Sequence, residues 1–329
     1  MEVVRGTSDY SSAMIDELRT YNIKFHRSPI RNNKLGIVLF PIWFLGIYLK
    51  FRPQIIHTHT EVPDLAIYLF HIVQKFTLQK IKYIRTIHNI KLWTDWGKIG
   101  SVVEKFFMRH HANIAISRAV QESYRTNYSE SPTIVFNGIE MTSQRKFRGL
   151  VENKINILFA GRLEYQKGID ELVAVVSHFA NDPMLIFHIV GNGSQKFKVE
   201  QLTNFSNVFY YDTIYNLSQY LFSFDYVFMP SNFEGLATLS IESSFGKTPV
   251  IINSCGGLEE TLPADWPLKV KNNSVQSYIS IFDNLPSQNV YRRLADIGYE
   301  YAYKNFTIEK MQQNYEYIYT EKIQEITVL

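Results

Sequence analysis

Residues 231–260 read SNFEGLATLSIESSFGKTPVIINSCGGLEE, and this stretch indicates the class of the fold. An apolar run at 226–230 precedes it and predicts a buried strand. An amphipathic helix is predicted over 236–245, where a following glycine and proline end it. A second strand is predicted at 250–253, and a glycine turn at 256–257 closes it. Strand, glycine turn, helix and strand make a βαβ unit, and open α/β sheets bind ligands at the carboxyl ends of such strands.

Two carboxylates frame the predicted helix, Glu234 before it and Glu242 near its end. Between them lie the backbone N–H groups of Gly235, Leu236 and Ala237, and a helix N-terminus offers such donors to phosphate. A carboxylate suits sugar hydroxyls because it accepts two strong hydrogen bonds from a diol. Together these groups predict a pocket for a nucleotide-activated sugar. The alternative is an ordinary acid near a helix start and a solvated acid on the helix.

The spacing of these motifs is similar to a known signature. Glu-Gly, a second glutamate eight residues after the first, then Gly-x-x-Pro-Val-Ile and Gly-Gly-x-x-Glu, resemble the motifs of retaining GT-B glycosyltransferases. The sequence is most similar to the family 4-like, group 1 enzymes that use nucleotide sugars to build bacterial surface polysaccharides. This resemblance implies an α/β fold of two Rossmann-like domains facing across a cleft. It also implies a C-terminal helix that crosses back to the first domain.

Length and the resemblance together predict the domain organisation. A chain of 329 residues is typical of about two domains. The polar run at 140–154 is typical of a linker. We therefore expect an acceptor-side domain over 1–145, a donor-binding domain over 146–305, and a final helix over 306–329 that braces the hinge.

Charge is distributed unevenly along the chain. Residues 1–150 hold 21 Lys and Arg against 11 Asp and Glu, a net charge of +10, whereas residues 151–329 hold 13 against 20, a net charge of −7. The basic half could attract anionic lipid, a lipid-linked phosphate or nucleic acid. No nucleic-acid motif accompanies it, so we expect no nucleic-acid partner. The single cysteine, Cys255, allows no internal disulfide and favours a reducing cytoplasm.

The longest apolar run lies at 35–49, with Pro41 inside it. No signal peptide is visible before it. Its 15 residues are fewer than the roughly 20 that a membrane-spanning helix needs. Two interpretations remain open. One is a buried helix of the first domain. The other is a helix in the membrane interface, held by Trp43, Tyr48 and basic flanks, which would make the protein peripheral at the inner face of the membrane.

The N-terminus departs from the pattern of the family. We expect a very short strand at 1–4, a helix at 10–20 and a strand at 23–29. These resemble the second and third strands of GT-B proteins better than the first and second, and Gly6 is a poor substitute for the expected glycine-rich turn. We therefore predict that the first strand and helix of the family are missing.

Histidines lie on two predicted strands of the first domain. His57 and His59 share one face of the strand at 54–60, so a zinc pair is conceivable. No third ligand of suitable spacing is near, and we expect no metal there but a polar strand end on the acceptor side. His88 ends the strand at 82–89, and the resemblance implies that it contacts the donor sugar. The alternative is a histidine satisfied by backbone in a loop.

The segment at 91–98 is rich in aromatic residues, and we expect it to be mobile and to recognise the acceptor. Helices are predicted at 101–110 and 118–128. Between them lies a strand at 112–117, and the resemblance puts its last residue, Ser117, near the donor. A further strand and Asn-Gly turn at 133–139 should end the first domain.

The second domain begins with a buried strand at 155–161 that ends in Gly161. Arg162 and Lys167 follow it and precede a helix at about 169–179, so they stand where a diphosphate could be held. The alternative is a pair of solvated cations.

Two further strands complete the donor side of the prediction. The strand at 184–190 ends in a turn at Gly191, which in the family lies beside the nucleotide. The strand at 208–211 is followed by Thr213 and Ile214, where similar proteins hold the base through backbone groups. The usual glycine is missing there, so the base is not indicated.

The resemblance implies a metal-independent hexosyltransferase without a cofactor. It would move a sugar from a nucleotide diphosphate, UDP before GDP, to a glycan or lipid-linked glycan acceptor of a surface or exopolysaccharide, with retention. Alternatives are a nucleotide-sugar epimerase of the same architecture, and a non-catalytic subunit or half-enzyme that needs a partner. The implied catalytic residues are His88, Arg162, Lys167 and Glu234, and the implied donor-binding residues are Gly161, Gly191, Thr213, Ile214, Gly235, Leu236, Ala237, Thr238 and Glu242.

Overall fold

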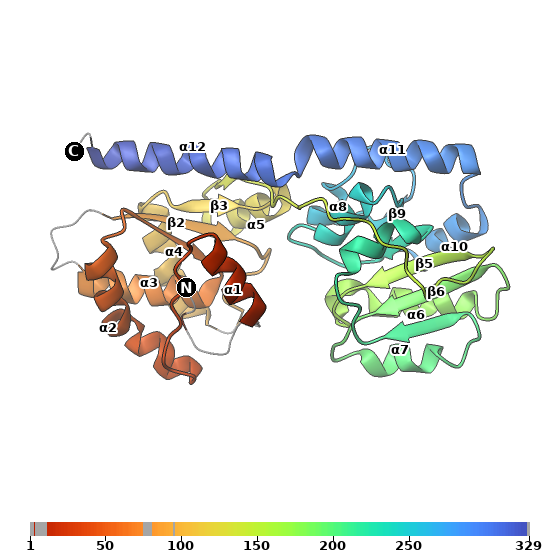
Figure 1. Cartoon of the computed structure of the whole chain (residues 1–329), viewed down its shortest axis with the longest axis horizontal. Helices are drawn as coiled ribbons and strands as arrows, with labels where there is room; N and C mark the ends of the chain where they lie inside the picture. Colours follow the sequence, from red (N-terminus) through yellow and green to blue (C-terminus); the bar gives the residue numbers. More distant parts are fainter. Residues whose placement is uncertain (1–2, 4–11, 75–80, 95, 328–329) are drawn as a thin grey trace. The chain divides into compact units, whose positions relative to one another are not determined.

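The computed structural model describes residues 3, 12–74, 81–94 and 96–327, and it divides into two compact units (Figure 1). Unit 1 comprises the described residues up to 115, together with 123–133 and those from 316 onward. Unit 2 comprises residues 116–122 and 134–315. Each unit has its own sheet and its own hydrophobic core.

Unit 1 is built on a four-stranded sheet of order β1-β2-β3-β4, in which β1 pairs with β2 and β2 with β3 in parallel. Buried apolar side chains fill the space between this sheet and its helices. Its strands are β1 (Ile55–His59), β2 (Lys82–Ile87), β3 (Asn113–Ala115) and β4 (Thr133–Ile134), and its helices are α1 (Ser12–Thr20), α2 (Asn33–Phe51), α3 (Glu61–Gln74), α4 (Gly97–Arg109) and the greater part of α5 (Arg118–Tyr128).

Two of the predicted strands of the first domain are wrong in extent. The segment at 23–29 forms no strand, and only Arg27 makes an isolated bridge. The strand expected at 133–139 is reduced to β4, while Ile139 bridges to Thr307 instead. Alternating apolar residues predict a strand, but a strand also needs a neighbouring edge along its whole length. The predicted strand at 1–4 lies outside the described residues except for Val3.

Helix α2 is longer than its apolar core suggested. The side chain of Asn32 accepts a hydrogen bond from the N–H of Leu35 and begins the helix, which then runs for 19 residues through Pro41. With a mean hydropathy of 1.6 it is, within the described residues, the single helix long and apolar enough to cross a membrane. Length and composition alone do not distinguish such a helix from a core helix, and about a third of this one is buried inside the protein.

A buried charge network joins the helices of unit 1 to its central strand. Arg85 on β2 donates from Nε to Asp64 at 2.6 Å and from Nη1 to Glu104 at 2.7 Å. Glu104 also accepts from the indole of Trp93 and the hydroxyl of Tyr124, each at 2.6 Å. Burial raises the pKa of Asp64 to about 6, although Arg85 opposes that shift. The three charged groups are almost wholly inaccessible, so each depends on the others for its hydrogen bonds.

This network overturns the predicted mobility of the aromatic segment at Trp93. Trp93 is 7% exposed, and its backbone adopts the left-handed conformation with φ of 55°. Its ring fills the space beside Gly100, where a Cβ would lie 2.2 Å from the ring. The hydrophobic pattern missed this because the partner carboxylate belongs to the following helix.

We expect Glu104→Ala to destabilise unit 1 by about 3–5 kcal/mol, because it leaves Arg85 buried with a single carboxylate. Urea unfolding followed by tryptophan emission measures this, since three of the four tryptophans lie in unit 1. Glu17→Ala on the exposed face of α1 is the matched control and should change stability by less than about 0.5 kcal/mol. Equal effects from the two variants would contradict the role of the network.

Unit 2 holds a six-stranded sheet of order β10-β9-β8-β5-β6-β7, in which neighbouring strands pair in parallel. Figure 1 shows α11 passing over α8, against which it packs. The strands of unit 2 are β5 (Ile155–Ala160), β6 (Leu185–Val190), β7 (Val208–Tyr211), β8 (Tyr226–Met229), β9 (Val250–Asn253) and β10 (Lys269–Val270). Its helices are α6 (Ile169–His178), α7 (Lys196–Leu202), α8 (Thr238–Phe245), α9 (Gly256–Glu259), α10 (Val275–Asp283), α11 (Gln288–Asn305) and the first part of α12 (Ile308–Thr327). Two 3₁₀ turns, η1 (Tyr165–Lys167) and η2 (Leu217–Ser223), also belong to it.

Candidate active site

The predicted donor residues of unit 2 lie on loops at one edge of its sheet. Because the strands are parallel, the loops that follow β5, β6, β8 and β9 all leave from their carboxyl ends. Glycines let these loops touch backbone to backbone. A Cβ at Gly191 would lie 1.8 Å from the carbonyl oxygen of Gly161, and one at Gly257 would lie 2.0 Å from that of Gly235. The missing side chains therefore let the loops at this edge pack closely against one another.

Three of the four predicted catalytic residues meet there. Lys167 Nζ lies 2.6 Å from Glu234 Oε1, which also accepts from the hydroxyl of Ser231 at 2.8 Å. The amide of Gln166 lies 3.4 Å from the other carboxylate oxygen of Glu234 and accepts from Arg162 Nη2 at 2.8 Å. Glu234 is only 4% exposed, whereas Arg162 is exposed. These contacts form a chain that runs from Lys167 and the buried Glu234 through Gln166 to the exposed Arg162.

Helix α8 starts at Thr238, two residues later than predicted. The N–H of Ala237 already donates to Gly257 O at 3.0 Å, so the prediction that it is open to a ligand is wrong. The glycine pair at 256–257 begins a short helix rather than a turn, and this places the acceptor there. In the part of the chain that the structure describes, no protein acceptor lies within hydrogen-bonding distance of the N–H groups of Leu236 and Thr238. These two remain as donors for an anion.

Two residues outside the predicted donor site, Ser117 and Glu260, form hydrogen bonds around this loop. The hydroxyl of Ser117 donates to Gly235 O at 2.5 Å, so it positions the loop rather than facing solvent. The carboxylate of Glu260, the last residue of the Gly-Gly-x-x-Glu motif, accepts from the N–H groups of Arg118 and Ala119 at 2.7 Å each. The spacing of this acid from the two glycines of the motif was the signal in the sequence that pointed to it.

Glu242 lines a separate cavity of about 210 Å³. Burial raises the pKa of its carboxyl, and among the described residues it has no hydrogen-bond or ion-pair partner. Glu140 from the linker and Tyr299 from α11 also line the cavity. The described lining of this cavity includes neither Lys167 nor Glu234.

The loop predicted to hold the base is tied to the glycine turn by a cluster that the sequence analysis missed. Asp212 binds Lys196 Nζ at 2.7 Å and accepts from the hydroxyl of Tyr210 at 2.8 Å, and these bonds lower its pKa. The Tyr210 hydroxyl also lies 2.8 Å from the carbonyl oxygen of Gly191. Of the predicted residues that follow, Thr213 is exposed and Ile214 packs partly against the core.

The fourth predicted catalytic residue, His88, belongs to a histidine cluster in unit 1. Its Nε2 lies 2.9 Å from Nδ1 of His59, whose ring stacks on that of His57. His57 is hydrogen bonded to Tyr319 and Thr86 at 2.8 Å each. Burial, with the neighbouring imidazoles, lowers the pKa of His57 to about 3 and that of His59 to about 4. No group of three or more His, Cys, Asp or Glu among the described residues could hold a metal ion.

Comparison with protein families accounts for both halves of the chain. The model of Glycosyltransferase Family 4 matches residues 2–143, and the model of Glycosyl transferases group 1 matches residues 140–296. This chain belongs to the family 4, group 1 glycosyltransferases. The family predicted from the motifs is therefore confirmed.

Two curated relatives are similar to this glycosyltransferase along much of its length. A 41.2 kDa protein in the cps region of Klebsiella pneumoniae is 27% identical over 237 residues, which cover 65% of this chain and 63% of that protein. A Bacillus subtilis protein named as a teichuronic acid biosynthesis glycosyltransferase is 25% identical over 275 residues, which cover 78% of this chain and 68% of that protein. The chain thus spans just under two thirds of the length of the Klebsiella protein.

A solved structure establishes the fold. The glycosyltransferase resembles Anabaena Alr3699/HepE, solved in complex with UDP and glucose, with a TM-score of 0.77 at 15% identity, covering 94% of this chain and 90% of that one. The GT-B fold predicted from the sequence is confirmed, with one parallel sheet in each of the two units.

Gly257→Ala should destabilise unit 2 by about 1–3 kcal/mol, because the new methyl group would collide with the carbonyl oxygen of Gly235. Gly298→Ala on α11 is the matched control, since its Cβ would meet only ordinary contacts beyond 3.4 Å. The measurement is the urea midpoint followed by far-ultraviolet circular dichroism. If both variants were as stable as the wild type, the close backbone contact would be wrong.

Unit 1 should lose stability in mild acid. His57 and His59 have lower pKa values in the folded chain than the ordinary 6.5, so the unfolded chain binds protons more readily as the pH falls from about 6.5 toward 4. The contribution of these two histidines to stability is fully present above that window and is lost below it. Comparing tryptophan-detected urea midpoints at several pH values between 7.5 and 4.5 measures the loss, and His57→Asn should reduce the slope. His111→Asn, at an exposed histidine, should leave it unchanged.

Proposed function

We propose that this glycosyltransferase moves a sugar from a nucleotide diphosphate, UDP in the first instance, to a glycan acceptor of a cell-surface polysaccharide. The observation that carries the proposal is the Lys167–Glu234 pair at the N-terminus of α8, with Glu242 on the same helix. A cation, open backbone donors and two carboxylates are the groups that a nucleotide sugar requires. The donor would bind within residues 146–305, and unit 1 would receive the acceptor.

The diphosphate would lie against Arg162, Lys167 and the open N–H groups of Leu236 and Thr238. A guanidinium binds two phosphate oxygens at once, and an ammonium adds a point charge. The backbone turns at Gly161 and Gly191 carry no side chain, so phosphate oxygens can approach them closely. In this position Lys167 would be shared between the phosphate and Glu234, which holds its Nζ at 2.6 Å.

Glu242 and Glu234 would each accept hydrogen bonds from hydroxyl groups of the donor, one from the ribose and the other from the transferred sugar. Glu242 would accept from the ribose hydroxyls, which supply the hydrogen bonds that its half-buried carboxylate lacks within the protein. Glu234, whose second oxygen receives only the 3.4 Å contact from Gln166, would accept from hydroxyls of the transferred sugar. The backbone of Thr213 and Ile214 would face the base, and Gly235 with Ala237 would shape the loop between the two carboxylates.

The reaction forms one bond and breaks one. The bond between the sugar C1 and the diphosphate oxygen breaks, and its electron pair stays on the leaving phosphate. The acceptor oxygen bonds to C1, and its proton passes to the leaving phosphate, so no protein general base is assigned. Arg162 and Lys167 stabilise the developing charge without a metal ion. We assign His88 to the donor sugar near C1, with retention of configuration as in similar enzymes.

Two similar proteins support the choice of substrates. Anabaena Alr3699/HepE was solved with UDP and glucose, which favours a UDP-sugar donor here. The Klebsiella relative is named for its place in a cps region, which favours a capsule-type or other surface polysaccharide as the acceptor. Such donors are made in the cytoplasm, and we assign the protein to that compartment, at the inner face of the membrane.

UDP should raise the melting temperature of the purified chain more than GDP or ADP does. At a hundred times its dissociation constant a ligand adds about 2.7 kcal/mol of stability, which is measurable by differential scanning fluorimetry. Glu242→Ala should abolish the shift, because the ribose loses its acceptor. Glu300→Ala, at an exposed position of α11, is the matched control and should keep it. No shift with any nucleotide would contradict the proposed donor site.

Lys167→Ala should lower the rate of sugar transfer about a hundredfold, since one contact to developing charge contributes on the order of 3 kcal/mol. The assay is release of UDP from UDP-glucose in the presence of a glycan acceptor. Lys271→Ala, an exposed cation of the same unit, is the control. A Lys167→Ala variant with the wild-type rate would remove the lysine from the mechanism.

A further inference from the structure

The peptide group between Gly235 and Leu236 joins a bonded carbonyl to an open N–H. Its carbonyl oxygen accepts from the hydroxyl of Ser117 at 2.5 Å. Its N–H, which belongs to Leu236, has no acceptor within hydrogen-bonding distance among the described residues, although Leu236 is only 8% exposed. A buried N–H without a partner costs free energy, so this group is suited to a ligand that brings an acceptor.

The geometry of a peptide group links these two observations. A peptide is planar and, here, trans, so its C=O and its N–H point in opposite directions. Because Ser117 fixes the carbonyl on one side, the N–H of Leu236 must point away from Ser117. A hydrogen bond to the carbonyl also polarises the peptide and makes its N–H a stronger donor. Ser117 therefore sets both the direction and the strength of this donor.

The hydroxyl of Ser117 is itself held in one orientation. The side chain is completely buried, and its oxygen accepts from the N–H of Val120 in the first turn of α5 at 3.1 Å. With its oxygen occupied in this way, the hydroxyl directs its proton to the carbonyl of Gly235. Ser117 and Val120 belong to unit 2, as does the loop at 234–237, so these bonds lie within one compact unit.

Glu260 binds the first turn of α5. Its two carboxylate oxygens accept from the N–H groups of Arg118 and Ala119, each at 2.7 Å. The carboxylate thereby satisfies two donors at this helix N-terminus and fixes the residues that follow Ser117. Gly256 permits the approach, because a Cβ there would lie only 2.7 Å from the Cβ of Ala119. Glu260 therefore acts on the loop through Ser117.

Backbone hydrogen bonds join the two ends of the same loop to the short helix α9. The N–H of Gly257 donates to Glu234 O at 3.2 Å, and the N–H of Ala237 donates to Gly257 O at 3.0 Å. The peptide after Gly235 lies between these bonds and takes part in neither. Since Gly235 has no side chain, its backbone can adopt many conformations. Among the described residues, the hydroxyl of Ser117 is the one hydrogen-bond donor that fixes the orientation of this peptide.

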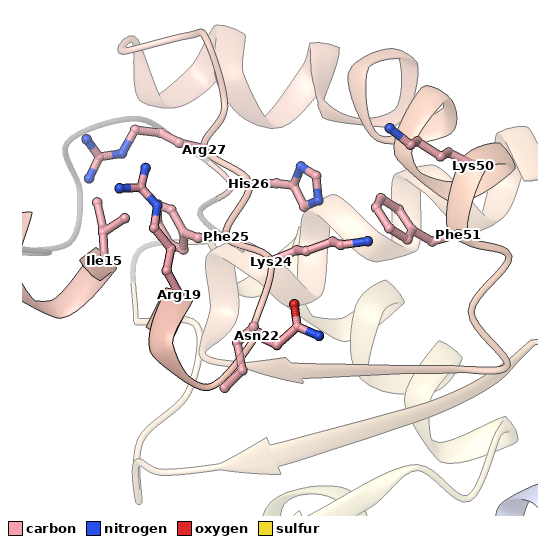
Figure 2. A pocket seen from close by; sticks show the side chains of 10 residues that line it. Ile15, Arg19, Asn22, Lys24, Phe25, His26, Arg27, Lys50 and Phe51 are labelled. Carbon is pink, nitrogen blue, oxygen red and sulfur yellow. The ribbon is translucent and has the colours of Figure 1, made fainter. Parts of the chain in front are cut away.

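The described lining residues of two larger hollows all belong to unit 1. An apolar groove of about 580 Å³ opens between α2, α3 and α4, and Val38 at its rim forms an apolar stripe with Ile42 on the exposed face of α2. A second hollow, of about 520 Å³, is a basic pocket. Figure 2 shows Arg19 and Arg27 toward one end of it and Lys50 toward the other. Lys50→Ala is therefore a control that changes the surface of unit 1 alone.

From these bonds we propose that Ser117, oriented by Glu260, directs the N–H of Leu236 at the leaving diphosphate and thereby speeds the transfer of the sugar. Both are positioning residues, since they act through the peptide and do not touch the donor. This role rests on the proposed function, in which a nucleotide diphosphate lies against that N–H.

The charge that develops during the reaction explains why orientation affects the rate. As the bond between the sugar and the diphosphate breaks, negative charge grows on the leaving oxygen. A fixed N–H that already points at this oxygen stabilises the transition state more than the ground state, and it needs no reorganisation at that moment. A peptide that is free to rotate must first be ordered, so the same N–H contributes less. Loss of the Ser117 hydroxyl should therefore lower kcat rather than raise KM.

The experiment compares UDP release from UDP-glucose by the full chain and by Ser117→Ala, with octyl glucoside as the acceptor. We expect kcat to fall about 10- to 100-fold, because an N–H that is no longer fixed loses much of the stabilisation that one such donor supplies. KM for UDP-glucose should change by less than about threefold, because the contact strengthens in the transition state. Ser117→Thr keeps the hydroxyl and should restore most of kcat.

Ser244→Ala is the matched control, because it removes another buried hydroxyl that donates to a backbone carbonyl oxygen, that of Ser240 at 2.9 Å. It should keep the wild-type kcat, as should Lys50→Ala. Glu260→Gln should lower kcat less than Ser117→Ala does, and the double variant should be no slower than Ser117→Ala, since both changes act on one peptide. Wild-type kcat in Ser117→Ala, a rise in its KM alone, or an equal loss in Ser244→Ala would overturn the proposal.

A second measurement reports on the peptide without any turnover. Gly-Leu pairs occur three times in the sequence, at 149–150, 235–236 and 257–258, so labelling with carbonyl-¹³C glycine and ¹⁵N leucine selects three amide signals in nuclear magnetic resonance spectra. Ser117→Ala should move the signal of Leu236 and leave that of Leu150 unchanged, and UDP should shift Leu236 in the wild type. An unmoved Leu236 signal in Ser117→Ala would refute the role of the hydroxyl. Wild-type signals that do not respond to UDP would instead contradict the donor site itself, so the two failures are distinct.

Discussion

At Gly191 and at Gly257 the position that a side chain would take is filled by a backbone carbonyl oxygen, of Gly161 and of Gly235 respectively. The candidate donor site depends on these two close backbone contacts. They bring the loops after β5, β6, β8 and β9 together at one edge of the sheet. The same packing occupies the N–H of Ala237, which donates to the carbonyl oxygen of Gly257 and is therefore not open to a ligand. Backbone geometry at glycine therefore decides which groups remain for phosphate and which are already satisfied.

The two glutamates of the motif differ in their electrostatic surroundings. Glu234 is buried but compensated, since Lys167 and Ser231 both bind one of its oxygens. Glu242 is half-buried without a partner among the described residues, and its carboxyl pKa is raised accordingly. A carboxylate that is costly to desolvate and is not compensated by the protein is stabilised by any ligand that brings hydroxyl donors. This difference is why the ribose is assigned to Glu242.

Unit 1 combines a rigid interior with two unusual surfaces. Its buried Arg85 network ties β2 to α3 and α4, and it fixes the ring of Trp93. Outside that interior, α2 presents an apolar stripe between a basic pocket and an apolar groove. The net charge of +10 in the first 150 residues predicted an anionic partner in general terms.

The sequence by itself determined that Arg162, Lys167 and Glu234 lie at strand ends, because periodicity is a local property of the chain. The resemblance of its motifs to known ones implied the family and the GT-B fold. The tertiary structure alone decided which side chains meet: the pairing of Lys167 with Glu234, the occupied N–H of Ala237, and the hydrogen bond between His59 and His88. Such partners lie many residues apart, and the packing of loops against one another determines whether they touch. Local patterns predict where a strand ends, but only the folded chain determines which distant side chains and backbone groups contact the residues at that end.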